Sequence, residues 1–176
     1  MEKVLTQKSS SSTYVLCLTG LFMGLNILMS SFGMPVPGGR LYLNDVIICT
    51  AALLLDTPLQ SFLVGGVGAF LGDLFFYPTP MFVSLATHGL QAVVITYIAH
   101  NCFKEKPAKA ALIGLALGAV IMVVGYSLGR AFIYSTPHYA YIKLPYQILQ
   151  AVVGAVGGYL LVFKGGLKEA LDKQRK

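Results

Sequence analysis

Three long stretches of this chain contain no charged side chain, and this pattern constrains the fold more than any other feature of the sequence. No Lys, Arg, Asp or Glu occurs in residues 74–103, 110–129 or 144–163. An apolar run of about 20 residues is long enough to cross a bilayer as a helix. Several such runs within 176 residues leave almost no room for a soluble domain. The sequence therefore predicts an all-α integral membrane protein.

The composition excludes several other classes. Hydrophobic residues make up 56% of the chain and charged residues 11%, whereas a soluble domain typically has about 25% charged residues. The net charge of +6 does not indicate nucleic-acid binding, because the basic residues lie between and beyond the apolar runs and form no stripe. Cys17, Cys49 and Cys102 lie in or beside apolar segments without the spacing of a metal site. We expect neither a metal nor a cofactor.

We expect a bundle of six transmembrane helices separated by Gly- and Pro-rich breaks and charged loops. A cytoplasmic N-terminal tail (1–13) and a basic cytoplasmic tail (164–176) flank a transmembrane substrate-binding domain (14–163). The six predicted spans are residues 14–32, 41–55, 59–76, 81–102, 108–133 and 144–163. The segment 134–143 is predicted to be a polar, aromatic loop.

The basic residues predict the orientation of this bundle. With six spans both termini lie on one side, and that side carries ten of the thirteen Lys and Arg residues. The other three are Arg40, Arg130 and Lys143. Because cytoplasmic loops carry an excess of Lys and Arg, we expect both termini in the cytoplasm of a prokaryotic cell. Arg40 and Lys143 are then expected to extend into the outer headgroups.

Small residues recur at helical spacing along several of the spans. Gly20 and Gly24 form a G-x-x-x-G pattern in the first span, and further glycine stripes occur in the third, fifth and sixth. Such stripes let membrane helices approach one another closely. No internal repeat is visible, which argues against a transporter built from inverted repeats.

The polar residues of the spans converge on the outer half of the membrane. At about 1.5 Å per residue, each falls in the outer half of its helix, while the inner halves, apart from His100, are nearly all aliphatic or glycine. This pattern predicts a pocket that is open to the outside and closed toward the cytoplasm. The candidate substrate-binding residues are Asn44, Asp45, Asp73, Tyr77, His88, Gln91, Arg130, Tyr146, Gln147 and Gln150.

Each candidate also has a purely structural interpretation. The tyrosines can form an interfacial belt, Asp45 can cap a helix, and Asp73 can pair with Arg130 to reduce the cost of burying both charges. His88 is the hardest to explain in this way, because it lies deep in the span beside Gly89 and Gln91. Residues 33–39, rich in Gly and Pro, would form a flexible lid over the pocket.

No catalytic motif is present in the sequence. There is no H-E-x-x-H, G-x-S-x-G or phosphate-binding P-loop pattern. The chain therefore cannot hydrolyse ATP by itself, and energy for uphill transport would have to come from a partner.

Several segments together resemble the substrate-binding S components of energy-coupling factor (ECF) transporters, which import vitamins. The resemblance covers nearly the whole chain and is closest to the hydroxymethylpyrimidine/pyridoxine or pantothenate subgroup. His88 stands where that subgroup tends to carry the lysine of a K-G-L sequence. The matching segments are Leu43-Asn44-Asp45-Val46 with residues 51–55, residues 65–68 with Gly72-Asp73-Leu74, His88-Gly89-Leu90-Gln91, and residues 145–150.

The resemblance implies both a mechanism and partners. An S component binds its vitamin from outside and then topples against a transmembrane scaffold (T) subunit, driven by two ATPase subunits. Family members dock through small residues of the first helix, a place that Gly20 and Gly24 occupy here. An imidazole in place of lysine favours an uncharged ring such as pyridoxine or hydroxymethylpyrimidine. Pantothenate is the next candidate, with Arg130 or Lys143 taking its carboxylate.

Three other functions stay open at this point. A self-sufficient small transporter or channel would need polar residues in the inner half, which the sequence does not supply. A scaffold subunit would use the same polar residues only to brace helices and would bind no ligand. A membrane enzyme is the least favoured, because no pair of nucleophile and base is evident.

Overall fold

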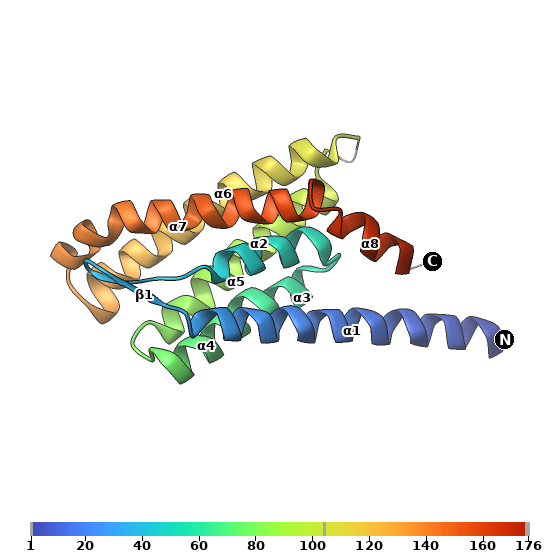
Figure 1. Ribbon diagram of the computed structural model, residues 1–176, viewed down its shortest axis with the longest axis horizontal. Helices are drawn as coiled ribbons and strands as arrows, with labels where there is room; N and C mark the ends of the chain where they lie inside the picture. Colours follow the sequence, from blue (N-terminus) through green and yellow to red (C-terminus); the bar gives the residue numbers. More distant parts are fainter. Residues whose placement is uncertain (1, 104, 175–176) are drawn as a thin grey trace.

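The computed structural model describes residues 2–103 and 105–174, which fold into a bundle of helices with a small β-hairpin at one end (Figure 1). The helices are α1 (Glu2–Ser30), α2 (Asn44–Leu54), α3 (Pro58–Phe62), α4 (Gly68–Phe76), α5 (Met81–Asn101), α6 (Pro107–Gly129), α7 (Pro137–Phe163) and α8 (Leu167–Gln174). The π-helical segments η1 (Leu63–Val67) and η2 (Arg130–Tyr134) join α3 to α4 and extend α6. The start of α1 and the end of α8 lie at the same end of the bundle, opposite the hairpin (Figure 1).

Within the described residues, five helical stretches are long and apolar enough to cross a membrane, and the protein is an all-α membrane protein apart from its hairpin. These stretches are Thr13–Ser30, Pro58–Phe76, Met81–Asn101, Pro107–Tyr134 and Pro137–Phe163. Helix α2 is also apolar but has 11 residues, about 16 Å or roughly half of the hydrocarbon core. The sixth span and the cytoplasmic location of the termini stay predictions.

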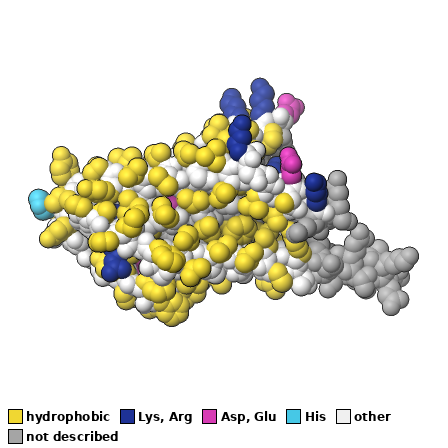
Figure 2. Space-filling model, in the orientation of Figure 1, with side chains coloured by type: hydrophobic (Ala, Val, Ile, Leu, Met, Phe, Trp, Pro, Cys, Tyr) yellow, Lys and Arg dark blue, Asp and Glu magenta, His cyan; other side chains and the backbone are white. Residues whose placement is uncertain are grey.

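The surface fits a lipid environment. On the face shown in Figure 2, hydrophobic side chains cover most of the bundle, while most charged side chains gather at the end that carries the termini and the α5–α6 loop. Large apolar side chains such as Leu16, Phe132 and Tyr141 are more than two-thirds exposed in the isolated chain. In water such a surface would drive aggregation, whereas lipid tails cover it without cost.

A β-hairpin occupies the segment between α1 and α2, where the sequence predicted only a break. Strands β1 (Met34–Val36) and β2 (Gly39–Leu41) pair antiparallel, with Met34 opposite Leu41. Gly38 closes the turn at a φ of +81°, a conformation that glycine adopts without strain. The predicted start of the second span at residue 41 is therefore wrong, because β2 ends there and α2 begins at Asn44.

The predicted loop at 134–143 is also largely helical. Helix α7 begins at Pro137, and the Thr136 hydroxyl accepts a hydrogen bond from the Tyr139 backbone N–H at 3.5 Å. A threonine cap followed by proline in the first turn is a strong helix start. Pro145, which the sequence placed near the start of the last helix, lies inside α7.

Close contacts between helices bring α2 into the middle of the bundle. A Cβ atom added at Gly154 of α7 would lie 2.5 Å from the Cβ of Asp45, and one added at Gly158 would lie 2.7 Å from the Cβ of Cys49. Only a residue without a side chain permits this approach. Helix α7 therefore packs directly on α2 and carries its polar residues toward the start of α2.

The π-helical segment η1 is fixed by a side chain of α1. A π-turn widens the helix and frees a backbone carbonyl from its usual partner. The Asn26 side-chain amide donates to the Val64 carbonyl oxygen at 2.6 Å, and Asn26 is fully buried. This contact ties α1 to the third crossing at the level of the bundle core.

Candidate functional site

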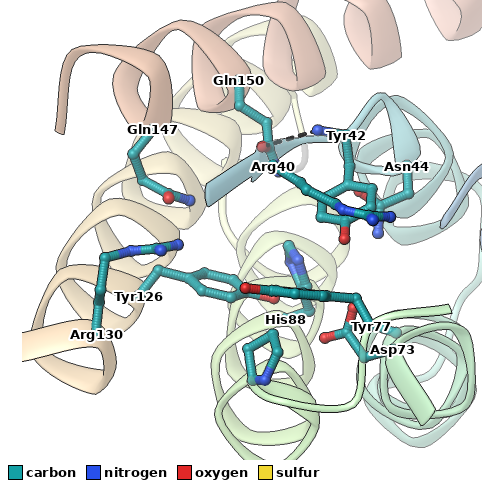
Figure 3. Close-up of a pocket in the computed structure, with 12 residues that line it drawn as sticks. Arg40, Tyr42, Asn44, Asp73, Tyr77, His88, Tyr126, Arg130, Gln147 and Gln150 are labelled. Carbon is teal, nitrogen blue, oxygen red and sulfur yellow. Dashed lines mark hydrogen bonds between the residues drawn. The ribbon is translucent and has the colours of Figure 1, made fainter. Parts of the chain in front are cut away.

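A cavity lies at the hairpin end of the bundle, enclosed by α2, α4, α5, α6, α7 and the segment after β2 (Figure 3). Its free volume is about 20 Å³, which is room for about one water molecule. A ring-shaped ligand can therefore enter only if side chains move apart. The lining residues are Arg40, Tyr42, Asn44, Ala69, Asp73, Tyr77, Pro80, His88, Tyr126, Arg130, Gln147 and Gln150.

The structure brings most of the candidate residues from the sequence together at this cavity. Asp45 and Gln91 do not line it but lie behind it, each 1% exposed. Tyr146 is half-buried and lies outside the lining. The candidates that line the cavity are Asn44, Asp73, Tyr77, His88, Arg130, Gln147 and Gln150.

One buried hydrogen-bond network joins three helices behind the cavity, and we call its four residues, Asp45, His88, Gln91 and Gln150, the Asp45 cluster. Asp45 accepts hydrogen bonds from the Gln91 side-chain amide at 3.0 Å and from the Gln150 side-chain amide at 2.7 Å. The Gln91 carbonyl oxygen lies 2.7 Å from Nδ1 of His88. The same His88 nitrogen is 3.7 Å from the Asp45 carboxylate. Side chains of α2, α5 and α7 are thus held in one arrangement.

A second network holds Asp73 on the opposite wall. The Tyr126 hydroxyl donates to the Ser84 hydroxyl at 2.5 Å, and the Ser84 hydroxyl donates to the Asp73 carboxylate. The expected ion pair between Asp73 and Arg130 is wrong, since no such contact occurs among the described residues. Arg130 instead donates to the Gly38 backbone carbonyl.

Aromatic rings flank the interior of the site. The rings of His88 and Tyr126 meet edge to face with their centres 5.1 Å apart. The Arg40 guanidinium lies 5.2 Å from the centre of the Tyr77 ring, and that of Arg130 lies at the same distance from Tyr134. Each arginine therefore rests on a π face rather than on a carboxylate.

Three side chains of η2 and α7 hold the hairpin and the extended segment after it. Arg130 binds the Gly38 carbonyl, Lys143 donates to the Arg40 carbonyl oxygen at 2.6 Å, and the Tyr42 backbone N–H donates to the Gln150 carbonyl oxygen at 3.1 Å. Lys143 is only 1% exposed, so its expected extension into the headgroups is wrong. Arg40 also lines the cavity but is exposed, so its extension into the headgroups stays a prediction. Lipid offers no hydrogen-bond partner to the N–H and C=O groups of an extended segment, so these side chains supply the partners. Whether residues 33–39 move as a lid stays a prediction.

Two polar atoms at the cavity have no hydrogen-bond partner among the described residues. They are the side-chain carbonyl oxygen of Asn44 and the hydroxyl of Tyr42, both of which are buried. A phenol is protonated at neutral pH, so the Tyr42 hydroxyl can donate a hydrogen bond. Because unpaired buried polar groups are costly, such atoms are the ones that a ligand satisfies.

The candidate residues from the sequence do not include Arg40, Tyr42 or Tyr126, although Tyr126 is one of the tyrosines that the sequence places on the outer side. Two patterns point to these residues. Successive residues of an extended chain point to opposite faces, so Arg40 and Tyr42 share one face. Tyr126 precedes Arg130 by four residues in a helical stretch, a spacing that puts both on one face. The predicted start of the second span at residue 41 hides the first pattern, because α2 begins only at Asn44.

The residues that the structure describes contain no group of three or more His, Cys, Asp or Glu side chains that could hold a metal ion. The arrangement is suited to binding: aromatic faces inside, amides and a phenol around them, and two guanidinium groups at the hairpin.

Comparisons with known proteins give two findings. The model of a family described as "ECF-type riboflavin transporter, S component" matches residues 10–168. A protein of Pyrococcus woesei, described as an uncharacterized protein in the gap 3′ region, is 31% identical over 142 residues. That alignment covers 80% of this chain and 88% of the relative.

Proposed function

The chain belongs to the ECF-type riboflavin transporter S component family, and we propose that its own substrate is riboflavin. Membership makes it a membrane-embedded, vitamin-binding subunit of a transporter rather than an enzyme. Riboflavin is our choice because it is the vitamin that the description of the matching family names.

The observation that carries the proposal is the chemistry of the cavity wall. Riboflavin combines a flat aromatic ring system, polar along one edge, with a chain of hydroxyl groups. Tyr77 and Tyr126 offer ring faces, and the amides of Gln147 and Asn44 offer polar partners. The unpartnered oxygen of Asn44 and hydroxyl of Tyr42 add an acceptor and a donor. Small-molecule sites typically combine apolar walls with a few placed polar groups in this way.

Pyridoxine and hydroxymethylpyrimidine form the second candidate class. The small free volume of about 20 Å³ favours them, because both are single rings that need less rearrangement of side chains than riboflavin does. Pantothenate comes third, with its carboxylate placed against Arg130.

We further propose that the chain works with a T scaffold subunit and two ATPase subunits in a prokaryotic cell membrane. The cavity would face outward and both termini would face the cytoplasm. Gly20 and Gly24 of α1 support docking of a partner helix. Both are exposed, and a Cβ atom added at either one would meet no atom within 4 Å. This leaves a smooth strip along the helix that a second helix can approach closely.

The direct test is to purify the full chain in detergent, denature it, and identify any released molecule by mass spectrometry. Riboflavin at about one molecule per chain is the expected result. Titration of the emptied protein with riboflavin, pyridoxine, hydroxymethylpyrimidine and pantothenate then ranks the candidates. Loss of flavin fluorescence measures the binding of riboflavin, and calorimetry measures the binding of the other three compounds.

Two variants connect the binding to the cavity. Gln147→Ala removes a lining amide, and we expect it to weaken binding at least tenfold, since an unpaired buried polar group costs about 1–3 kcal/mol. Gln60→Ala, in α3 and outside the cavity lining, should leave the affinity unchanged. Equal effects of the two variants would contradict this location of the site. A protein that binds no member of the panel would favour a scaffold subunit.

A further inference from the structure

The Asp45 carboxylate fixes the direction of the hydrogen bonds behind the cavity. A carboxylate has acceptors only, so the amide that faces it must present its N–H₂ end. Gln91 does so toward one carboxylate oxygen at 3.0 Å and Gln150 does so toward the other at 2.7 Å. Asp45 is 1% exposed, and burial of this kind leaves water little access to compete. The orientation of both glutamine amides follows from this one carboxylate.

The orientation of Gln91 in turn fixes the tautomer of His88. With its N–H₂ end on Asp45, Gln91 meets Nδ1 of His88 with its carbonyl oxygen, at 2.7 Å. A carbonyl oxygen only accepts, so Nδ1 must carry the proton. A neutral imidazole has a single N–H, and its other nitrogen, Nε2, is then a pure acceptor.

We propose that His88 presents the lone pair of Nε2 to the cavity and selects ligands that offer a hydrogen-bond donor on their ring. His88 lines the cavity, and Nε2 has no hydrogen-bond partner among the residues that the structure describes. The Gln150 carbonyl oxygen, in contrast, already accepts one hydrogen bond, from the Tyr42 backbone N–H at 3.1 Å. Asp45 acts as a positioning residue that sets the polarity of His88 through Gln91.

The inference rests on the proposed vitamin-binding function and narrows the class of substrate. Riboflavin offers the ring N–H at N3, and pyridoxine offers its ring hydroxyl. Both vitamins offer a ring donor to Nε2 of His88, so the experiment must distinguish riboflavin from pyridoxine.

The first test reads the tautomer directly and needs no ligand. The full chain, labelled with ¹⁵N-histidine in detergent, contains His88, His100 and His138, and the His88→Gln variant identifies the His88 signals. We expect a neutral ring protonated at Nδ1. A ring protonated at Nε2, or at both nitrogens at neutral pH, would overturn the proposal.

Two matched variants test whether Asp45 sets this tautomer. Asp45→Asn supplies one acceptor and one donor, so one glutamine amide must turn, and the tautomer of His88 should become mixed. Asp73→Asn alters another cavity carboxylate whose partner is Ser84, and it should leave the tautomer as it is. A purely structural role for Asp45 would leave the His88 signals of the two variants alike.

The second test uses two pairs of ligands, riboflavin with 3-methylriboflavin and pyridoxine with its 3-O-methyl ether. Whichever parent binds, its methylated partner should bind roughly tenfold more weakly or worse, because Nε2 then lacks a donor. In His88→Phe, which removes the acceptor, this discrimination should shrink. Equal binding of a parent and its methylated form by the unaltered chain would overturn the proposal. If neither parent binds, the proposed vitamin is wrong, while the tautomer measurement still decides the polarity of His88.

Discussion

Asp45 and Asp73 are 1% and 7% exposed, and neutral donors satisfy both carboxylates. Asp45 receives two amides and Asp73 receives a hydroxyl. A cation in the same place would add its own desolvation cost. As a consequence, Arg40 and Arg130 are not engaged by these carboxylates and remain at the hairpin side of the cavity.

Lys143 provides a test of how the hairpin is held. In Lys143→Met the donor to the Arg40 carbonyl is lost while the length of the side chain is kept. We expect faster hydrogen exchange of the amides in residues 34–42 and release of the bound vitamin that is several-fold faster. The Arg40 carbonyl oxygen is left without its donor, so we also expect a loss of about 1–3 kcal/mol in stability.

Mass-spectrometric hydrogen exchange and stopped-flow release measure the two effects. Lys109→Met is the control, because Lys109 lies over the Phe103 ring in the α5–α6 region and should change neither. Unchanged exchange and release in Lys143→Met would show that Arg130 and Gln150 suffice to hold the segment.

For single residues, the sequence predicted which polar side chains lie at one end of the bundle but not which hydrogen-bond partners they have. Depth along a helix follows from its rise per residue, so Asn44, His88 and Gln147 could be placed at one end in advance. The partners of Asp73 and Lys143 depend on helix rotation and on a backbone segment that is extended. Packing sets both, and the sequence pattern does not show them.

At the level of elements, the contact between α2 and α7 positions the Asp45 cluster. In Gly154→Ala the new Cβ would lie 2.5 Å from the Cβ of Asp45 and 3.2 Å from its carbonyl carbon. One of these atoms is backbone, so α7 must move away from α2. We expect a loss of about 1–3 kcal/mol in stability together with weaker vitamin binding, because Gln150 moves with α7.

Thermal unfolding in detergent and a vitamin titration check this prediction. Gly24→Ala makes the same chemical change at an exposed helix position with no atom within 4 Å of the new Cβ, and it should be neutral or slightly stabilising. Similar losses in the two variants would mean that intrinsic helix preference, rather than the α2–α7 contact, controls the effect.

Most helices could be predicted from the sequence because each is a long apolar run, as in residues 81–102 and 108–133. The hairpin could not, since β1 and β2 have three residues each and the side chains of α7 that hold Arg40 and Tyr42 are 103 and 108 positions away. The start of α7 was overlooked because residues 137–143 are polar and aromatic, although Thr136 and Pro137 signal a helix.

For the whole molecule, the site occupies one end of the bundle and an apolar core occupies the other. Buried residues such as Leu18, Ile48 and Leu115 form one cluster in the half away from the hairpin. A binding site that ends on such a core offers no path across the membrane. Movement of the vitamin therefore calls for partner subunits, in keeping with the family to which the chain belongs.

Substitutions in the exposed strip on α1 test whether vitamin uptake requires partner subunits. Gly20→Leu combined with Gly24→Leu should leave vitamin binding in detergent unchanged but abolish uptake in cells that express the complete transporter. Uptake of radiolabelled riboflavin measures the effect. Ala116→Leu, an equally bulky change at an exposed position of α6, should leave uptake intact. Uptake into liposomes that contain this chain alone would contradict the dependence on partners.

The shortness of α2 has a consequence for how the chain enters the membrane during synthesis. Its 11 residues carry too little apolar length to partition alone, and the extended residues before it present peptide groups that lipid cannot satisfy. The side chains that satisfy them, Arg130, Lys143 and Gln150, belong to the last third of the chain to leave the ribosome. A nascent chain that stops at residue 128 should therefore leave a cysteine placed at residue 36 open to water-soluble thiol reagents. The completed chain should protect the same cysteine, so the first half of this protein finishes its insertion only when the last helix arrives.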